Sequence, residues 1–280
     1  SCPRGGKKGM RSMSGYYENK VAAITGAASG IALEMAEQFL KREARAVFMG
    51  DFNEENLSRE SQRLGRNYPG KVFPVVMDVT KREQVAGFIE SAADHAGHLD
   101  FVCNIAGVGV TIPTERVTLE IWDKAIDLNL KGVIYGTYSA IPIMREQGFG
   151  HIINAGSIAG LLPIPYQAVY AATKAAVISM TESLQYELEV EGLQFSVFCP
   201  ANVRTPIFGD MTPPADSIGV DEAVLYILQE MEKKSVVIVL PQSARDFYTL
   251  YRERKEEFDK LARQLAAERR ENYRTKGTYY

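Results

Sequence analysis

Three side chains in the middle of the sequence could together exchange a proton with an alcohol. Tyr170 and Lys174, in the segment YAATK, are four residues apart, so they share one face of a predicted helix. A phenol with a pKa of about 10 is a poor base, but a neighbouring ammonium favours the phenolate. Ser157 follows a predicted strand, and its hydroxyl could hold the substrate oxygen while Tyr170 takes the proton. A tyrosine–lysine pair without such a serine nearby usually marks a helix face that is exposed to solvent.

A turn near the start of the chain points to a bound dinucleotide. The segment TGAASGIA, residues 25–32, follows one predicted strand and opens a helix. Gly26 permits a tight turn, and Gly30 lets backbone N–H groups approach a pyrophosphate at the positive end of the helix. Ala32 stands where a third glycine is expected, and the pattern tolerates its added methyl group. The alternative is a purely structural strand-to-helix turn.

An acidic residue at the end of the next strand indicates which dinucleotide is bound. Asp51 lies about twenty residues beyond the glycines, where a carboxylate accepts hydrogen bonds from the adenosine ribose and repels a 2′-phosphate. Neither the turn nor the residues just after Asp51 carry a lysine or arginine that would offset this repulsion. We therefore expect NAD(H) in preference to NADP(H). Asp51 could instead cap the following helix, although Asn53 fits that role better.

Strands and helices alternate regularly along the chain and must bring these residues together. Short apolar runs predict seven strands, at 21–25, 46–50, 72–77, 101–105, 151–155, 195–199 and 236–240. Amphipathic segments predict helices at 30–43, 54–66, 81–96, 118–147, 166–190 and 221–233. This order predicts an α/β fold, a Rossmann-type doubly wound sheet of mainly parallel strands with helices on both faces.

The same pattern predicts how the chain is divided. We expect a disordered leader at 1–19 and one domain at 20–242 that binds the dinucleotide and carries the catalytic residues. The remaining segment, 243–280, is expected to form a single long, charged amphipathic helix.

Composition and charge exclude several other classes of protein. The net charge of −3 leaves no basic surplus for nucleic acid, and no apolar run reaches the roughly 18 residues of a membrane span. The leader has no apolar signal region, and Cys103 and Cys199 suit buried thiols, so we expect a cytoplasmic protein. The three histidines lack the neighbours of a metal site, so no metal is expected.

With these motifs in this order, the chain resembles the short-chain dehydrogenases/reductases, in their shorter single-domain branch, over residues 20–240. The resemblance implies a catalytic set of Asn129, Ser157, Tyr170 and Lys174. Asn129 would kink a helix and hold a water through which Lys174 relays protons. The resemblance also implies that NAD is bound by Gly26, Ser29, Gly30, Ile31, Asp51, Asp78, Val79, Asn104, Ala106, Gly107, Tyr170, Lys174, Pro200, Val203 and Thr205.

Three positions depart from the pattern of this family. Ala32 replaces the last glycine of the turn, Ala201 stands where a glycine commonly follows Pro200, and Glu43 occupies the place where a glycine usually ends the first helix. None of them removes a catalytic group, so we expect an effect on cofactor affinity rather than on chemistry. A glycine-rich ending that is frequent in the family is replaced here by the C-terminal helix.

The resemblance implies that a secondary alcohol is oxidised or a ketone reduced. Arg204 is the one basic residue near the expected pocket, so we expect a hydrophobic substrate, such as a steroid-like, prostanoid-like, terpenoid or aryl alcohol. The loop 206–217 is the expected lid. The residues expected to line the pocket could also simply belong to the core; they are Val108, Ile158, Leu161, Leu162, Pro163, Ile164, Ile207, Phe208 and Met211.

The resemblance further implies a homodimer or homotetramer, in which the helices that carry Asn129 and Tyr170 pack against those of another copy. The C-terminal helix could pack on its own subunit, reach a neighbouring one or bind another protein. A non-catalytic NAD(H)-binding sensor or scaffold is the alternative function, although such a protein need not keep the proton-transfer residues. A sugar-nucleotide epimerase shares the tyrosine–lysine pair but typically has a longer C-terminal region.

Overall fold

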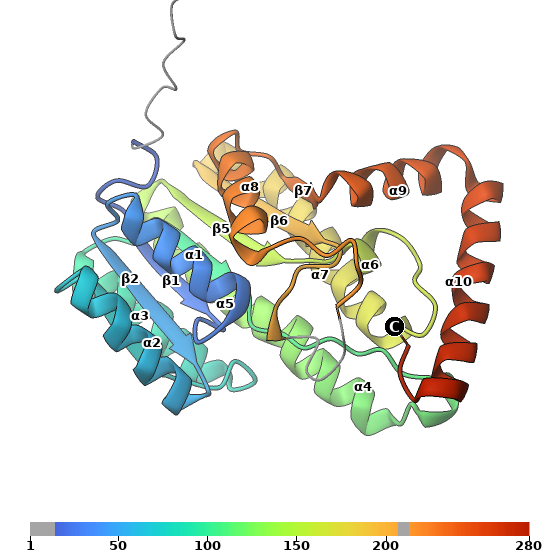
Figure 1. The fold of residues 1–280 in the computed structure, drawn as a ribbon. Helices are drawn as coiled ribbons and strands as arrows, with labels where there is room; N and C mark the ends of the chain where they lie inside the picture. The colour runs from blue at the N-terminus through green and yellow to red at the C-terminus, as the bar shows by residue number, and fades with distance from the viewer. Residues whose placement is uncertain (1–14, 207–212, 280) are drawn as a thin grey trace, which may run out of the picture.

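A sheet of seven strands runs through the centre of the molecule (Figure 1). The structure, a computed structural model, describes residues 15–206 and 213–279. The strands lie in the order β3-β2-β1-β4-β5-β6-β7, and every neighbouring pair is parallel, so the predicted doubly wound fold is confirmed. They are β1 (Val21–Thr25), β2 (Ala46–Asp51), β3 (Val72–Val76), β4 (Phe101–Asn104), β5 (Gly150–Ala155), β6 (Leu193–Pro200) and β7 (Val237–Leu240).

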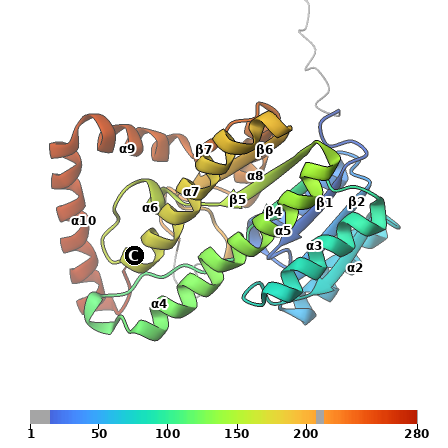
Figure 2. The same ribbon diagram turned by 180° about the vertical axis from the view of Figure 1, so that it is seen from behind.

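Helices cover both faces of this sheet (Figures 1 and 2). One face carries α1 (Gly30–Lys41), α2 (Glu54–Asn67) and α8 (Val220–Glu232). The other carries α3 (Arg82–Ala96), α5 (Gly132–Gln147) and α7 (Ala168–Leu188). Shorter helical segments are η1 (Thr114–Arg116), α4 (Leu119–Ile126), η2 (Asp127–Lys131), α6 (Ile158–Leu161) and η3 (Glu189–Glu191). Within the described ranges, no helix is both long and apolar enough to cross a membrane.

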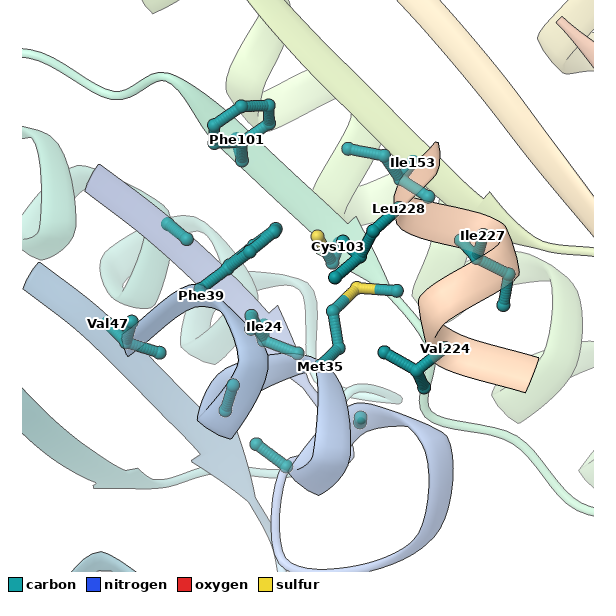
Figure 3. Close-up of a cluster of buried hydrophobic side chains, with 14 of the residues drawn as sticks. Ile24, Met35, Phe39, Val47, Phe101, Cys103, Ile153, Val224, Ile227 and Leu228 are labelled. Atoms are coloured by element: carbon teal, nitrogen blue, oxygen red, sulfur yellow. The ribbon is translucent and has the colours of Figure 1, made fainter. Parts of the chain in front are cut away.

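Apolar side chains fill the space between the sheet and α1 and α8 (Figure 3). Met35 of α1 and Leu228 of α8 lie against Ile24 and Cys103 of the central strands. The central strands are buried along their whole length, as their continuous apolar runs predict. Cys103 is a free, buried thiol, as expected from its apolar surroundings.

The strand order reverses between β1 and β4, and ligands bind in the crevice at the carboxyl ends of such a pair. The glycine turn follows β1 and the segment 104–107 follows β4, so both predicted cofactor segments lie beside this crevice. Thr25 joins them, because its hydroxyl oxygen accepts hydrogen bonds from the N–H groups of Ile105 at 3.0 Å and Ala106 at 3.3 Å.

The helix predicted over 118–147 is interrupted near its middle. Between α4 and α5, the segment η2 is a π-helical turn with the buried Asn129 at its centre. A π-turn inserts an extra residue into the helical repeat and redirects the chain. A distortion therefore occurs at the residue where the resemblance implies a kink.

Residues 15–19, predicted as part of the disordered leader, are ordered. Within the stretch 1–19, expected to be disordered, Tyr17 is fully buried and its hydroxyl donates to the Leu228 carbonyl at 2.7 Å. The ring of Tyr16 packs against Phe101. The prediction was wrong for residues 15–19, because the basic composition of the leader gave no sign that two aromatic rings fill the amino-terminal edge of the sheet. Residues 1–14 lie outside the described residues.

The C-terminal extension forms two helices instead of the single one predicted. The helices α9 (Gln242–Glu253) and α10 (Lys255–Lys276) meet at Arg254, whose φ of −132° and ψ of 60° are not helical. The break allows Phe258 of α10 to pack on the rings of Phe247 and Tyr251 of α9. Burial of Phe258 in this aromatic cluster offsets the interrupted helical hydrogen bonds, and the local sequence pattern does not show it.

Glu43, just beyond α1, adopts a backbone conformation that favours glycine. Its φ is +64°, and its side chain is exposed. A residue with a Cβ is strained in this region by about 1 kcal/mol. Glu43→Gly is therefore expected to raise the free energy of unfolding by about 0.5–1 kcal/mol, measured by urea denaturation. Glu43→Ala removes the same side chain but keeps the Cβ, so an equal gain in this control would contradict the explanation.

Candidate active site

Ser157 and Tyr170 border one cavity at the carboxyl edge of the sheet. Ser157 follows the end of β5, and Tyr170 lies in the first turn of α7. Both line a cavity of about 590 Å³. The N–H of Ala159 donates to Ser157 Oγ at 3.2 Å, so this hydroxyl caps the short helix α6 and is held in place. Two members of the predicted catalytic set thus share one space.

Lys174 lies one helical turn beyond Tyr170 and is buried. Its Nζ lies 5.7 Å from the centre of the Tyr170 ring and donates to the carbonyl of Ala155 at 2.7 Å. Burial lowers the pKa of Lys174 to about 8. At pH 7 the amine is still mostly protonated, so a positive charge lies beside the phenol and favours its ionised form.

Asn129 is held against the segment that follows β4. Its Oδ1 accepts from the N–H of Val108 at 2.8 Å, and its Nδ2 donates to the Val108 carbonyl at 2.9 Å. A Cβ on Gly107 would come within 2.9 Å of Asn129 Oδ1 and 3.6 Å of Lys174 Nζ. Because Gly107 has no Cβ, these two polar atoms border the same small space, as a relay between them requires.

The glycine turn has the features of a pyrophosphate site. Gly26 has a φ of +74°, and a Cβ there would come within 2.9 Å of the Ala106 Cα. Gly30, with a φ of +59°, opens α1; there the Ser29 side chain makes no capping hydrogen bond and the first turn carries no acidic residue. Backbone N–H groups at such a helix end suit an anion. Ala32 is buried in the core, so its methyl group does not narrow the turn.

Asp51 ends β2 beside this turn. Its Oδ2 accepts a hydrogen bond from the N–H of Ala28 at 3.0 Å, and its Oδ1 accepts one from the N–H of Asn53 at 2.9 Å. The cap of α2 is Asn53, whose side chain accepts from the N–H of Asn56. Asp51 is therefore not the helix cap, and its carboxylate is fixed where the adenosine ribose of a dinucleotide lies in this fold.

The end of β6 and the segment that follows it reach the same cavity as Ser157 and Tyr170. Pro200, Val203 and Thr205 line it together with Ile31 from the first turn of α1. A Cβ on Gly30 would lie 3.5 Å from the Cβ of Thr205, so the glycine turn and this segment are in close contact. Predicted cofactor residues from two distant parts of the chain thus meet beside Ser157 and Tyr170.

Three other predicted cofactor residues direct their side chains elsewhere. Asn104 Nδ2 donates to Asn154 Oδ1 at 2.9 Å, which ties β4 to β5. Asp78 Oδ1 accepts from the N–H and the hydroxyl of Thr80, at 2.9 and 2.8 Å. Val79 is buried. The side chains of Asn104 and Val79 are thus both buried in the structure.

The substrate side of the cavity differs from the prediction. Of the apolar residues expected there, two line it, Ile158 and Ile164. Four described ones do not, namely Val108, Leu161, Leu162 and Pro163. Leu162 shows why, because it is buried against Leu250 and Phe258 of the C-terminal helices. Ile207, Phe208 and Met211 of the expected lid lie outside the described residues.

The C-terminal helices supply a wall of the cavity that sequence analysis missed. Arg269 of α10 lines the cavity, which corrects the expectation that Arg204 is the one basic residue nearby. The Arg204 guanidinium instead donates to the carbonyl of Ser217. No local pattern links the C-terminal segment to the cavity. Pro214 and Asp216, which also line the cavity, belong to the described part of the loop expected as the lid. Further lining residues that were not predicted are Gly109, Thr111, Gln167, Ala201, Asn202, Ser243, Ala244, Phe247 and Leu265.

Comparisons of the sequence with known proteins agree with this geometry. The family model described as short chain dehydrogenase matches residues 20–215. An uncharacterized oxidoreductase of Staphylococcus epidermidis is 35% identical over 218 residues, which are 76% of this chain and 92% of the relative. The 3-oxoacyl-[acyl-carrier-protein] reductase FabG of Thermotoga maritima is 34% identical over 234 residues, 82% of this chain and 93% of the relative.

A solved structure agrees as well. A short-chain dehydrogenase/reductase from Burkholderia phymatum, crystallised in complex with NAD, matches with a TM-score of 0.79 at 27% identity, covering 86% of this chain and 95% of that one. Sequence motifs, strand order and cavity thus agree with the match of the family model, which spans more than half of the chain. The chain belongs to the short-chain dehydrogenase family and is an oxidoreductase of that family.

Proposed function

We propose that the protein interconverts a secondary alcohol and a ketone, with NAD as the hydride carrier. One observation carries this proposal: Ser157 and Tyr170 line the same cavity as Ile31 and Thr205, which belong to the predicted cofactor segments. A substrate oxygen held by the first pair would therefore lie next to a dinucleotide held by the second. The NAD complex of the Burkholderia phymatum relative supports this choice of cofactor.

In this mechanism Tyr170 is the acid–base residue. For oxidation, its phenolate oxygen takes the hydroxyl proton of the alcohol; for reduction, its phenol returns the proton to the ketone oxygen. The Lys174 ammonium stabilises the phenolate, and the Ser157 hydroxyl donates a hydrogen bond to the substrate oxygen. The chemistry that bound NAD supplies is hydride transfer. A water at Asn129 would connect Lys174 with solvent.

Asp51 is proposed to set the preference for NAD(H) over NADP(H). Asp51→Asn removes the charge and keeps one side-chain oxygen, which can accept from the N–H group of either Ala28 or Asn53 but not from both. The ratio of NADPH to NADH dissociation constants is expected to fall about tenfold, because the carboxylate no longer repels the 2′-phosphate or makes charged hydrogen bonds to the ribose. Fluorescence titration with both cofactors measures this ratio. An unchanged ratio would remove Asp51 from cofactor selection.

The proposed reaction is tested with a panel of steroid, prostanoid, terpenoid and aryl alcohols and their ketones, assayed with NAD(H) and NADP(H) in parallel. A 3-oxoacyl thioester belongs in the panel because the Thermotoga maritima relative is named as a 3-oxoacyl reductase. We expect turnover of bulky apolar substrates. Sugar alcohols and 2-hydroxy acids are included as polar comparisons, and faster turnover of these compounds would contradict the apolar substrate class. A protein that binds NADH but turns over none of these compounds would be the sensor or scaffold.

A homodimer or homotetramer is proposed as the assembly, and the cytoplasm as the compartment. Large apolar side chains are exposed on the helices expected to pack against another copy: Leu119 of α4, Tyr138 of α5 and Tyr186 of α7. Measuring the mass in solution of the full chain and of a chain lacking 243–280 separates an intersubunit role of the C-terminal helices from other roles. The free, buried thiols of Cys103 and Cys199 suit a reducing compartment.

A further inference from the structure

The C-terminal arm, defined as α9 and α10, gives the cavity a wall of mixed character. Phe247 and Leu265 contribute apolar side chains, and Arg269 contributes a guanidinium. Leu265 and Arg269 are four residues apart on α10, so they lie on the same face, one turn from each other. Along the axis of α10, the wall of the cavity therefore changes from apolar to cationic.

Arg269 differs from the other charged residues of α10 because it is buried. It is 6% exposed, whereas Arg263, Arg270 and Arg274 are exposed. Its Nη1 donates to the carbonyl of Pro165 at 2.6 Å, a contact across 104 residues of sequence. This hydrogen bond helps to fix the orientation of the guanidinium. Burying a charged group costs free energy. Because α10 has many exposed positions, its solubility does not require that Arg269 be buried, so the burial of Arg269 needs another explanation.

The end of α10 is fastened to the body of the protein just beyond Arg269. Tyr273 stacks on Tyr279 with ring centres 4.9 Å apart, and Tyr279 meets Tyr166 at 5.3 Å. Arg116 lies over the ring of Tyr273 at 5.1 Å. In Figures 1 and 2 the chain end turns back from α10 toward the body. These contacts hold Arg269 in position before any ligand binds, which reduces the entropy lost on binding.

The described wall of the cavity carries two charged side chains of opposite sign, Arg269 and Asp216. Asp216, the acidic residue there, is exposed, and its carboxylate accepts a hydrogen bond from Asn202 Nδ2 at 3.2 Å. Water and salt screen an exposed carboxylate far more than a buried guanidinium. Inside the cavity, solvent therefore weakens the field of the Asp216 carboxylate more than that of the Arg269 guanidinium.

We propose that Arg269 is a specificity-determining residue that binds a carboxylate at the far end of an otherwise apolar substrate. This inference rests on the proposed function, because Ser157 and Tyr170 must hold the reacting oxygen in the same cavity. The apolar body of the substrate lies along Phe247 and Leu265, and the planar guanidinium donates paired hydrogen bonds to the carboxylate. The substrate class is then an amphipathic hydroxy or oxo acid whose carboxylate is remote from the reacting carbon.

The test measures binding of oxo acids of graded chain length, and of their methyl esters, to the full chain with oxidised NAD present, so that no ketone is reduced during the measurement. Wild-type protein is expected to bind the best acid at least about tenfold more tightly than its ester. In Arg269→Gln this ratio is expected to fall to about one. Arg269→Lys is expected to restore part of it, because lysine keeps the charge without the planar fork. Arg263→Gln, which removes an exposed arginine of the same helix, is the matched control and should keep the wild-type ratio.

Two results would overturn this inference: equal binding of acids and esters by the wild type, or an unchanged ratio in Arg269→Gln. Thermal denaturation shows whether each variant is folded. If Arg269→Gln is not folded, the acid-to-ester affinity ratios of the wild type and of Arg269→Lys are compared instead, and an equal ratio in these two proteins would also contradict the inference. Turnover is measured separately. Equal binding and turnover of esters and acids would refute the role of Arg269 and leave alcohol–ketone chemistry intact. A preference for acids without any turnover would refute the proposed function instead.

Discussion

Replacing Tyr170 with phenylalanine is expected to lower kcat/KM by about a hundredfold to ten-thousandfold while the affinity for NADH changes little. The substitution removes the oxygen that takes the proton and keeps the ring whose centre lies 5.7 Å from Lys174 Nζ. The packing of α7 should therefore be preserved. Initial rates of NADH formation and fluorescence titration with NADH measure the two quantities separately.

Tyr186→Phe is the matched control for this substitution. Tyr186 lies on the same helix but is 72% exposed in the single chain, so its hydroxyl has no role in the proposed reaction. The substitution keeps the ring that is proposed to pack against another copy, so full activity is expected. An equal loss of activity and of NADH affinity in Tyr170→Phe would assign Tyr170 to cofactor binding. Unchanged activity would remove it from the proton transfer altogether.

Acidification is expected to destabilise the protein through His151. This buried imidazole lies between the Tyr16 hydroxyl and Ser196 Oγ, at 2.9 and 2.8 Å, and burial lowers its pKa from 6.5 to about 3. Above pH 6.5, His151 is neutral in both the folded and the unfolded chain. Between pH 6.5 and 3, only the unfolded chain binds the proton. The free energy of unfolding therefore falls with pH by about 1.4 kcal/mol per unit, to a total of about 5 kcal/mol.

Urea denaturation at pH 7, 6 and 5 measures this effect in a range where most carboxyl groups stay ionised. His151→Gln is expected to be less stable at pH 7, because it disturbs a buried hydrogen-bond network, but to lose less stability between pH 7 and 5. His95→Gln is the control, since His95 is exposed and should leave the wild-type slope unchanged. Equal slopes in the wild type and His151→Gln would show that His151 does not carry the pH dependence.

The sheet and the placement of the proposed catalytic residues could be predicted because local patterns encode them. Continuous apolar runs predict parallel strands that are covered on both faces, and the alternation with helices predicts their order. The spacing of Tyr170 and Lys174 fixes them on one face of α7, and Ser157 lies two residues beyond the end of β5. Such features depend on residues close together in sequence, so no tertiary information is needed to find them.

The missed features all depend on contacts between distant parts of the chain. Tyr17 bonds to Leu228, and Arg269 bonds to Pro165, and neither pairing leaves a local signal in the sequence. The break at Arg254 is stabilised by the packing of Phe258 on α9, whereas the local amphipathic pattern favours an unbroken helix. The wall of the cavity was therefore predicted least well. The C-terminal arm forms part of this wall, and it reaches the cavity only through tertiary packing.

The most direct test of the proposed chemistry follows the transferred hydrogen itself. A secondary alcohol deuterated at its carbinol carbon is mixed with the wild-type protein and NAD, and the mass of the cofactor is measured. If Tyr170 removes the hydroxyl proton while the hydride moves to the cofactor, we expect one deuterium in the NADH that forms. A protein that binds the cofactor yet transfers no deuterium from any alcohol of the panel would contradict the proposed oxidoreductase activity.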